Sequence, residues 1–467
     1  MTLASQEEAR THGPFRLLTA LFGDPEVAEI FSLNRTVAYW LEVEIALADA
    51  QAECGVVSAA EAEAIRSAAR PEDVNIPELL RASRIVGYPI LPLIRDVANR
   101  LDGGKAGAGR LHYGATTQDI MDTALALQLR DVIARMDRLV DELGRALAGL
   151  VDSHRGTVMV ARTHAQQAVP TTFGAKLAVT LSELARQRRR LAAAANSVAV
   201  VSLFGAGGTS AALGPDAART RGLVAKALRL ETTDVPWHVA RDRVAEFGLV
   251  CGLLAGTCAR FAREVVDLSR TEIGELSEEE GHHRGASSTM PQKHNPIASE
   301  AVIGMAATVG ALASSFLRAM EAGHERAAGE WQIEWLIIPD VAYLTASALG
   351  LCGQIARGLS VFPDVMRRNL NHSAGFVMAE AYMMALAPDV GRENAHDLIY
   401  EAVVQARREG RTLPEQLRSV DHDRFARLTE LAPDGYLGDT GLVCESALRD
   451  WSDSVREAES AARGDAS

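Results

Sequence analysis

Cysteine and aromatic residues are scarce in this chain of 467 residues. The five cysteines are odd in number and form no CxxC pair, so they provide no disulfide framework and favour a reducing, cytoplasmic setting. Cys251 and Cys258 are seven residues apart, on one face of a helix, and we interpret them as core residues because free cysteine packs like a small hydrophobe. We expect no metal site, since the histidines at 282, 283 and 294 lack a second ligand set at metal spacing.

Positive charge is in the minority, with 48 Lys and Arg against 61 Asp and Glu and a formal net charge of -13. Nucleic acids and anionic membranes are bound through clustered positive charge, so we expect neither as a partner. No unbroken apolar run reaches the roughly 18 residues that a membrane helix needs. A small anionic substrate remains compatible with this composition, because it responds only to local charge.

Aromatics make up only 5% of the chain, while alanine and leucine are plentiful, which favours packed helices over sheets. Apolar residues recur at helical spacing through long segments, and no segment shows strand alternation. Gly248, Gly252 and Gly256 lie on one helical stripe, which predicts a close approach between two helices. The fold class is therefore predicted to be all-α, with long helices over 120–150, 173–200, 239–278, 299–320 and 340–360.

Breaks in the helical pattern predict three domains. We place a helical N-terminal domain at 1–110, a long-helix bundle at 111–365 and a helical C-terminal domain at 366–467. The glycine-rich stretch GAGGTS at 205–210 lacks a preceding strand and the full GxGxxG spacing, so we expect no nucleotide cofactor there and no cofactor elsewhere.

Polar islands interrupt the helices at 111–124, 161–174 and 285–296, with a weaker one at 323–331. Each lies near a predicted helix end, where unpaired backbone N–H groups attract anions. Caps and turns are the alternative, and Thr116 and Asp119 fit that role. Capping alone does not explain His164, Lys293 or the paired serines of the third island.

The third island, GASSTMPQKHNP, closely resembles the GSSxMPxKxNP signature of the fumarase/aspartase superfamily, with Ala286 in place of a glycine. GATTQD resembles the first characteristic region of that superfamily, and RTHAQQAVPTTFG resembles the second. The resemblance implies a helical, three-domain subunit whose long bundle forms a homotetramer, with each active site shared by three subunits. The implied reaction is elimination from a substituted succinate, which releases fumarate.

The resemblance also implies roles for individual residues. Ser287 takes the position of the catalytic base, Lys293 and Asn295 hold the carboxylate beside the reacting carbon, and His164 orients the substrate or assists the leaving group. Arg241 has an open alternative, which is to pair with neighbouring acids. The remaining predicted substrate contacts are Thr116, Thr117, Gln118, Thr163, Gln166, Ser288 and Arg326.

The branch of the superfamily is less sharply defined. LFGDPEVAEIFS, PWHVARDRVAE and HERAAGEWQIEW resemble the 3-carboxy-cis,cis-muconate cycloisomerase branch. His164 is present as in the fumarate-releasing lyases, although cyclising members often lack it. Adenylosuccinate lyases commonly carry an Arg-Tyr phosphate contact near the N-terminus, where this chain has only GPFRLL, which argues against a nucleotide substrate. Tyr88 stands where those enzymes usually have histidine, which departs from their acid–base pairing. We predict a lyase that breaks a C–N bond, with nitrosuccinate among the candidate substrates. A cycloisomerase, an adenylosuccinate lyase and a non-catalytic helical scaffold stay open as alternatives.

Overall fold

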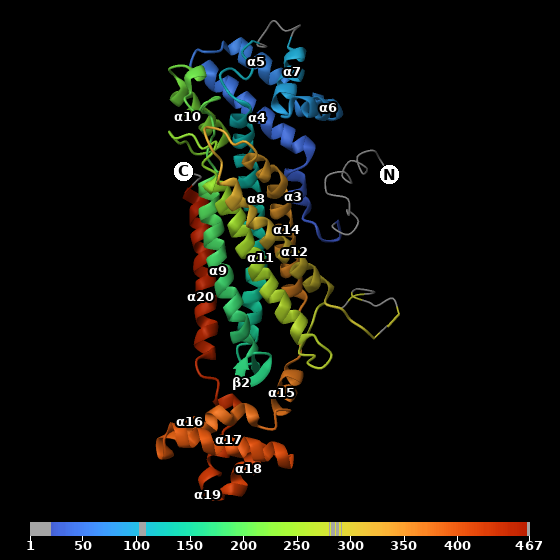
Figure 1. The fold of residues 1–467 in the computed structure, drawn as a ribbon, viewed down its shortest axis with the longest axis vertical. Coiled ribbons are helices and arrows are strands. Elements are labelled where there is room, and N and C mark those ends of the chain that lie inside the picture. Colours follow the sequence, from blue (N-terminus) through green and yellow to red (C-terminus); the bar gives the residue numbers. More distant parts are fainter. Residues whose placement is uncertain are drawn as a thin grey trace. The chain divides into compact units, whose positions relative to one another are not determined.

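The computed structural model describes residues 20–101, 109–279, 281, 285, 289–290 and 292–464, and most of them are helical. Figure 1 shows the elements in chain order. The first half contains α3 (Pro25–Ile30), α4 (Leu33–Glu53), α5 (Ala59–Ala68), α6 (Ile76–Val86), α7 (Ile90–Arg100), α8 (Thr117–Ser153), β1 (Val158–Thr163), β2 (Gln166–Thr172), α9 (Phe173–Val198), α10 (Ala217–Leu228) and α11 (Asp242–Leu268). The second half contains β3 (Leu276–Ser277), α12 (Ile297–Ala313), α13 (Ser315–Ala319), α14 (Glu330–Gly358), β4 (Ser360–Val361), α15 (Pro363–Asn371), α16 (Ala379–Val390), α17 (Arg392–Glu409), α18 (Leu413–Val420), α19 (His422–Phe425) and α20 (Thr440–Gly464).

The predicted helical class is confirmed, and the long helices lie close to their predicted positions. The segments 120–150 and 173–200 correspond to α8 and α9. The segment 239–278 overlaps α11, which ends earlier, at Leu268. The segment 299–320 is divided into α12 and α13, and α14 begins ten residues before its predicted start.

The expectation of no strands is wrong, because β1 and β2 form an antiparallel hairpin. Its two strands pair Val158 with Thr172 at the open end and Thr163 with Gln166 at the turn. β-Branched residues supply much of both strands, and this composition favours a pleated backbone. The hairpin occupies the second polar island, which the sequence indicated only as the entrance to a helix.

Contacts within the chain define two compact units, each built from three stretches of sequence. Unit 1 comprises residues 1–139, 187–256 and 304–350, and unit 2 comprises residues 140–186, 257–303 and 351–467. The predicted division near residues 110 and 365 stays a prediction.

Unit 1 has two apolar cores. In one, α4 packs with the start of α8 and with α10 around Tyr39, Leu47 and Leu127. In the other, α4 packs with α5 and α7 around Leu41, Ile65 and Leu93. The glycine stripe of α11 also lies in this unit. A Cβ at Gly248 would lie 2.3 Å from the Phe316 ring, which confirms the predicted close approach there.

Unit 2 has its own core, in which β1 packs with α15–α18 around Val160, Tyr382 and Leu413. The helices α16, α17 and α18 form a separate cluster at one end of this unit (Figure 1). A capping box at Thr412 and Glu415 fixes the start of α18.

The two predicted core cysteines, Cys251 and Cys258, are both buried, which confirms that interpretation.

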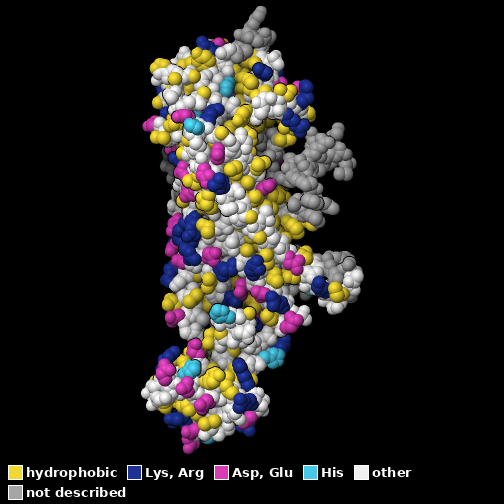
Figure 2. All heavy atoms as spheres, viewed as in Figure 1, with side chains coloured by type: hydrophobic (Ala, Val, Ile, Leu, Met, Phe, Trp, Pro, Cys, Tyr) yellow, Lys and Arg dark blue, Asp and Glu magenta, His cyan; other side chains and the backbone are white. Residues whose placement is uncertain are grey.

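Three helical stretches are long and apolar enough to cross a membrane by length and composition alone: Asp242–Leu268, Ile297–Ala319 and Glu330–Gly358. Most of the apolar window of the first and third is buried within the protein, at 61% each, which identifies them as core helices. Only 33% of the corresponding window of Ile297–Ala319 is buried, so this stretch presents an apolar face. Basic and acidic side chains are interspersed over the described surface in Figure 2.

Candidate active site

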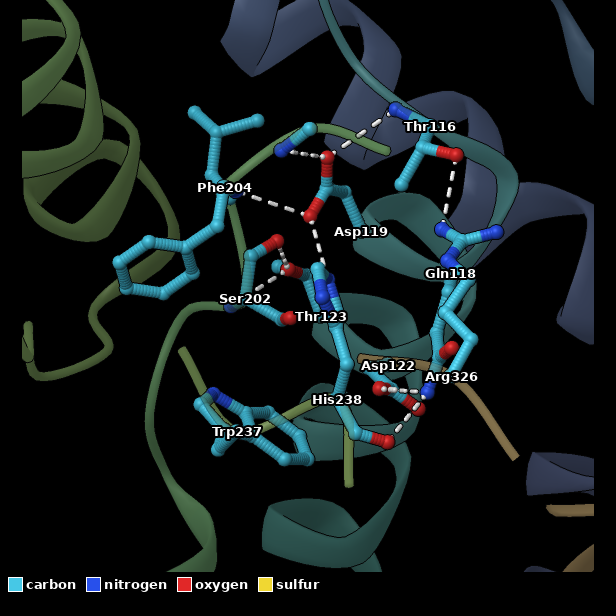
Figure 3. Close-up of polar contacts among 12 residues, drawn as sticks. Thr116, Gln118, Asp119, Asp122, Thr123, Ser202, Phe204, Trp237, His238 and Arg326 are labelled. Atoms are coloured by element: carbon cyan, nitrogen blue, oxygen red, sulfur yellow. Dashed lines mark hydrogen bonds and ion pairs between the residues drawn. The ribbon is translucent and has the colours of Figure 1, made fainter. Parts of the chain in front are cut away.

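The first polar island forms the start of α8, in unit 1. Asp119 is fully buried, and its carboxylate accepts hydrogen bonds from the amides of Thr116, Phe204 and Gly205 at 2.9–3.0 Å. Its fourth contact is His238 Nε2 at 2.8 Å, shown with the others in Figure 3. Because an ionised carboxylate only accepts, we assign the proton of His238 to Nε2. Asp119 thus fixes both the helix start and the glycine-rich loop after residue 203.

Close backbone packing holds these two segments together. Gly114 has φ +78°, and a Cβ there would lie 2.6 Å from the carbonyl oxygen of Ala212. A Cβ at Gly205 would lie 3.3 Å from the Gly114 carbonyl oxygen, so the first island packs against the start of the GAGGTS stretch as well as against Ala212. Only a glycine at 114 permits this approach. His112, at φ 60°, hydrogen-bonds through Nδ1 to the buried Glu44 at 2.6 Å. Burial would lower the pKa of His112, but the Glu44 charge and hydrogen bond outweigh it, so that pKa lies above its usual value.

Arg326 meets Thr116 at the start of α8, which brings together two predicted substrate contacts. Arg326 Nη2 donates to Thr116 Oγ1 at 2.7 Å (Figure 3). Arg326 Nε is buried and has no hydrogen-bond partner among the described residues. Thr117 is half-buried beside them and opens the helix, where free backbone N–H groups favour an anion. A guanidinium with donors to spare at a helix start can hold a carboxylate.

Gln118 and Arg241 lie deeper in unit 1. Gln118 Nε2 donates to Asp122 Oδ2 at 3.0 Å and to the His238 carbonyl at 2.8 Å. Arg241 is 2% exposed, and its guanidinium donates to both carboxylate oxygens of Asp122 and both of Glu334, at 2.5–3.1 Å. The side chain therefore pairs with acids, the alternative that the sequence left open, although these acids lie on other helices. Its role as a substrate contact stays a prediction.

Burial and charge pairing oppose each other in the Arg241 ion-pair cluster, which consists of Arg241, Asp122 and Glu334. The pKa of Arg241 is raised, because the two carboxylates outweigh the opposing effect of burial. Burial raises the pKa of Glu334, although Arg241 opposes that shift. The cluster holds α8, the start of α11 and α14 at fixed distances in unit 1.

The second island presents its predicted residues at the tip of the β1–β2 hairpin, in unit 2. His164 and Ala165 form the turn with φ 49° and 61°, between the paired residues Thr163 and Gln166. Two consecutive positive φ values characterise the tight turns that suit a hairpin. Thr163, His164 and Gln166 are all exposed, so they are accessible to a ligand or another chain. Arg162 anchors the tip through two bonds to the buried Glu275, at 2.6 and 2.9 Å.

The third island is described only in part. Ser287 and Ser288 lie outside the described residues. Gly285 has φ +67°, and its carbonyl accepts hydrogen bonds from Asn295 N at 3.1 Å and Nδ2 at 3.0 Å. Lys293 is exposed, and its amide donates to the Met290 carbonyl at 3.1 Å. The Gly285–Asn295 contact closes the base of the loop, and one amide donor predicted for substrate binding is used there.

A buried carboxylate fixes the chain after the loop. Glu278 is 2% exposed and accepts from the amides of Ala298 and Ser299 and from the Ser299 hydroxyl, at 2.6–3.2 Å. It thereby caps the start of α12, where unpaired amides are stabilised by negative charge. Within the described residues, no group of three or more His, Cys, Asp or Glu side chains is arranged to hold a metal ion.

Three features escaped the sequence analysis: His238, the Arg241 ion-pair cluster and an aromatic cluster of Tyr88, Trp331 and Trp335. The Tyr88 ring stacks on Trp331 at a centroid distance of 6.1 Å and meets Trp335 edge-on at 5.9 Å. The ring centroids of Trp331 and Trp335 are 4.8 Å apart. The spacing of four residues between the tryptophans signals one helix face, but Tyr88 is far away in the sequence.

Comparison with known proteins places these features in context. The family model described as "Lyase" matches residues 23–310, and the model "Adenylosuccinate lyase C-terminus" matches residues 375–444. The chain is 38% identical to trans-aconitate decarboxylase 1 of Mycosarcoma maydis, over 90% of this chain and 86% of that protein. It is 38% identical to 3-carboxy-cis,cis-muconate cycloisomerase of Pseudomonas aeruginosa, over 93% of this chain and 96% of that one.

Two further relatives cover nearly the whole chain. N-acetyl-S-(2-succino)cysteine lyase of Dickeya dadantii is 36% identical, over 93% of this chain and 96% of that protein. The crystal structure of 3-carboxy-cis,cis-muconate lactonizing enzyme from Pseudomonas putida superposes with a TM-score of 0.88 at 36% identity, over 94% of this chain and 100% of that one.

Proposed function

This chain belongs to the fumarase/aspartase superfamily of lyases, in its cycloisomerase-like branch, and on that premise we propose that it releases fumarate from a small substituted succinate. The observation that carries the proposal is the pairing of Arg326 with Thr116 at the start of α8. The buried, unpartnered Nε of Arg326 leaves a donor for a substrate carboxylate. The relative named as a succinocysteine lyase supports a succinyl substrate.

The chemical difficulty of the reaction is the proton next to a carboxylate, which is barely acidic. Its removal places extra negative charge on the carboxylate oxygens, and preplaced donors in a water-poor site lower that barrier. We assign Ser287 as the base and Lys293 as the fixed positive charge that favours its alkoxide form, as the family signature implies. His164, Thr163 and Gln166, exposed on the hairpin tip, would contact the substrate.

The chain is proposed to act as a homotetramer with active sites shared by three subunits. The exposed hairpin tip and the apolar face of the stretch from α12 to α13 support this arrangement, since both suit contact with another copy. Ile297 is 38% exposed and Leu317 is 50% exposed on that stretch. A mass of four chains in solution is the expected result. The cytoplasmic setting and nitrosuccinate as a substrate stay predictions from the sequence.

The relatives named as cycloisomerases favour a second candidate, the cyclisation of a carboxylated muconate. A panel of reactions separates the two functions. The protein is incubated with fumarate and either ammonia, a primary amine or a thiol, and separately with 3-carboxy-cis,cis-muconate, and the products are followed by NMR. We expect an adduct of fumarate with an amine. Turnover of the muconate without any fumarate adduct would replace the lyase by the cycloisomerase.

A further inference from the structure

We propose that a cavity beside the aromatic cluster holds the leaving group, and that this group is an amine carrying an apolar substituent. The inference rests on the proposed function and narrows its substrate to an N-substituted aspartate. It comes from unit 1 alone, where α4, α6, α8 and α14 line a cavity of about 360 Å³ that opens to the surface. That volume lies within the range of sites for small organic ligands.

The walls of the cavity are almost entirely apolar. A peptide-like or sugar-like group would leave its polar atoms without partners against such walls, at a considerable cost in free energy. An aliphatic or aromatic group would instead gain from burial. The apolar lining includes Val37, Trp40, Leu79, Leu80, Met121 and Trp335.

Tryptophan is concentrated here. Trp40, Trp331 and Trp335 line the cavity, and they are three of the five tryptophans in the chain. Tyr88 packs against Trp331 and Trp335 next to the cavity. Indole faces attract cations through their π electrons, most strongly where the cation is shielded from water. The aromatic walls therefore suit an organic ammonium better than a neutral or anionic group of the same shape.

The charged side chains at the cavity wall are acidic, which is the sign that attracts an organic ammonium. Asp122 and Glu334 are the charged side chains among its described lining residues, and both are fully buried. With Arg241, the ion-pair cluster has two carboxyl groups and one guanidinium, so its formal charge is -1 when both carboxyl groups are ionised. Because the surroundings of the cluster are of low polarity, its excess negative charge is poorly screened. A cationic leaving group would be stabilised here, whereas an anionic one would be repelled.

The cavity is within reach of the proposed carboxylate site. Thr116 and Asp122 are six residues apart at the start of α8, which corresponds to about 9 Å along the helix axis. Between them along the chain, Gln118 donates a hydrogen bond to Asp122. Trp331, near the start of α14, follows Arg326 by five residues in the chain. One small molecule can therefore place a carboxylate at Arg326 and an N-substituent among the tryptophans.

This substrate class also requires no histidine as a proton donor at position 88, where the Tyr88 ring packs in the aromatic cluster. A secondary amine in the substrate is protonated at neutral pH. When the base removes the proton from carbon, the C–H electron pair forms the C=C bond of fumarate. The C–N pair then leaves with nitrogen, which departs as a neutral primary amine and takes up a proton from water.

The test is a fluorescence titration of the full-length protein with benzylammonium, benzyl alcohol and benzoate, each with and without fumarate. We expect benzylammonium to quench tryptophan emission and bind about tenfold more tightly than benzyl alcohol, with benzoate weaker still. Trp331→Leu should reduce cation binding about tenfold, whereas Trp331→Phe should retain most of it. Trp451→Phe is the control, because Trp451 lies in unit 2 and outside the cavity lining.

A second variant avoids the buried core. Leu80 is 42% exposed at the cavity, so Leu80→Trp should fill the space and abolish benzylammonium binding without unfolding the chain. Equal binding of cation and alcohol, or binding that survives Leu80→Trp, would overturn the inference. Turnover of fumarate with ammonia or a thiol, without cation binding, refutes the cavity assignment alone. Absence of fumarate binding and of all fumarate turnover refutes the proposed function instead.

Discussion

Replacement of Arg326 by alanine gives the sharpest prediction about substrate binding. The variant loses the Nη2 bond to Thr116 and the buried, unpartnered Nε. Each hydrogen bond to a charged group contributes about 1.5–3 kcal/mol, so a carboxylate held by two such bonds gains about 3–6 kcal/mol. Arg326 is partly exposed, and screening by solvent reduces the gain to about 3 kcal/mol. A loss of that size corresponds to roughly a 10²-fold fall in kcat/KM.

The assay compares Arg326→Ala, Arg326→Lys and a surface control under identical conditions. Lysine keeps the charge but loses the fork of donors, so it should recover only part of the lost kcat/KM. Arg392→Ala is the matched control, because Arg392 is exposed on α17 and pairs only with the neighbouring Glu393 among the ion pairs of the described residues. Circular dichroism should give all three variants the wild-type melting temperature within a few degrees. A kcat/KM for Arg326→Ala within about twofold of wild type would refute the carboxylate assignment.

Three other perturbations probe the folding of the site. Because the pKa of His112 is raised in the folded protein, its pairing with Glu44 stabilises the fold fully below about pH 6.5 and less as the pH rises through the folded-state pKa. Urea unfolding at several pH values should show this dependence of the free energy of unfolding. Glu44→Gln should abolish it. Gly285→Ala should lower kcat with little change in melting temperature, since its Cβ would lie 2.6 Å from the Asn295 carbonyl at a strained φ; a normal kcat would contradict this. Arg241→Met should cost about 3–5 kcal/mol of stability by leaving two buried carboxylates unpaired, and an unchanged calorimetric melting temperature would argue otherwise.

The sequence predicted the helices well where a single periodic stripe ran for many turns. Leu125, Leu129 and Leu143 kept one face of α8 apolar, and that helix was located within three residues at each end. Pro339 concealed the early part of α14, because proline is usually read as a helix boundary. The β1–β2 hairpin was missed because its strands are short and its outer half is polar.

The candidate site likewise combines residues that the sequence predicted with residues that it did not. Thr116 and Arg326 were predicted as substrate contacts from motifs and lie in direct contact, although they are 210 residues apart. Motifs could not reveal the Arg241 ion-pair cluster, because Asp122 lies on α8, Glu334 lies on α14, Arg241 directly precedes α11, and no local pattern joins them. The same holds for Tyr88 beside Trp331, since packing between distant segments is decided by the tertiary fold.

The most direct measurement is fumarate consumption by wild type and Ser287→Ala in the presence of a primary amine, with fumarate binding followed by calorimetry. If Ser287 is the base that makes the C–H bond breakable, the variant should bind fumarate as wild type does. Its turnover should fall by about 10²–10⁴-fold, the usual contribution of a positioned proton acceptor. A variant that turns over at nearly the wild-type rate would contradict the account.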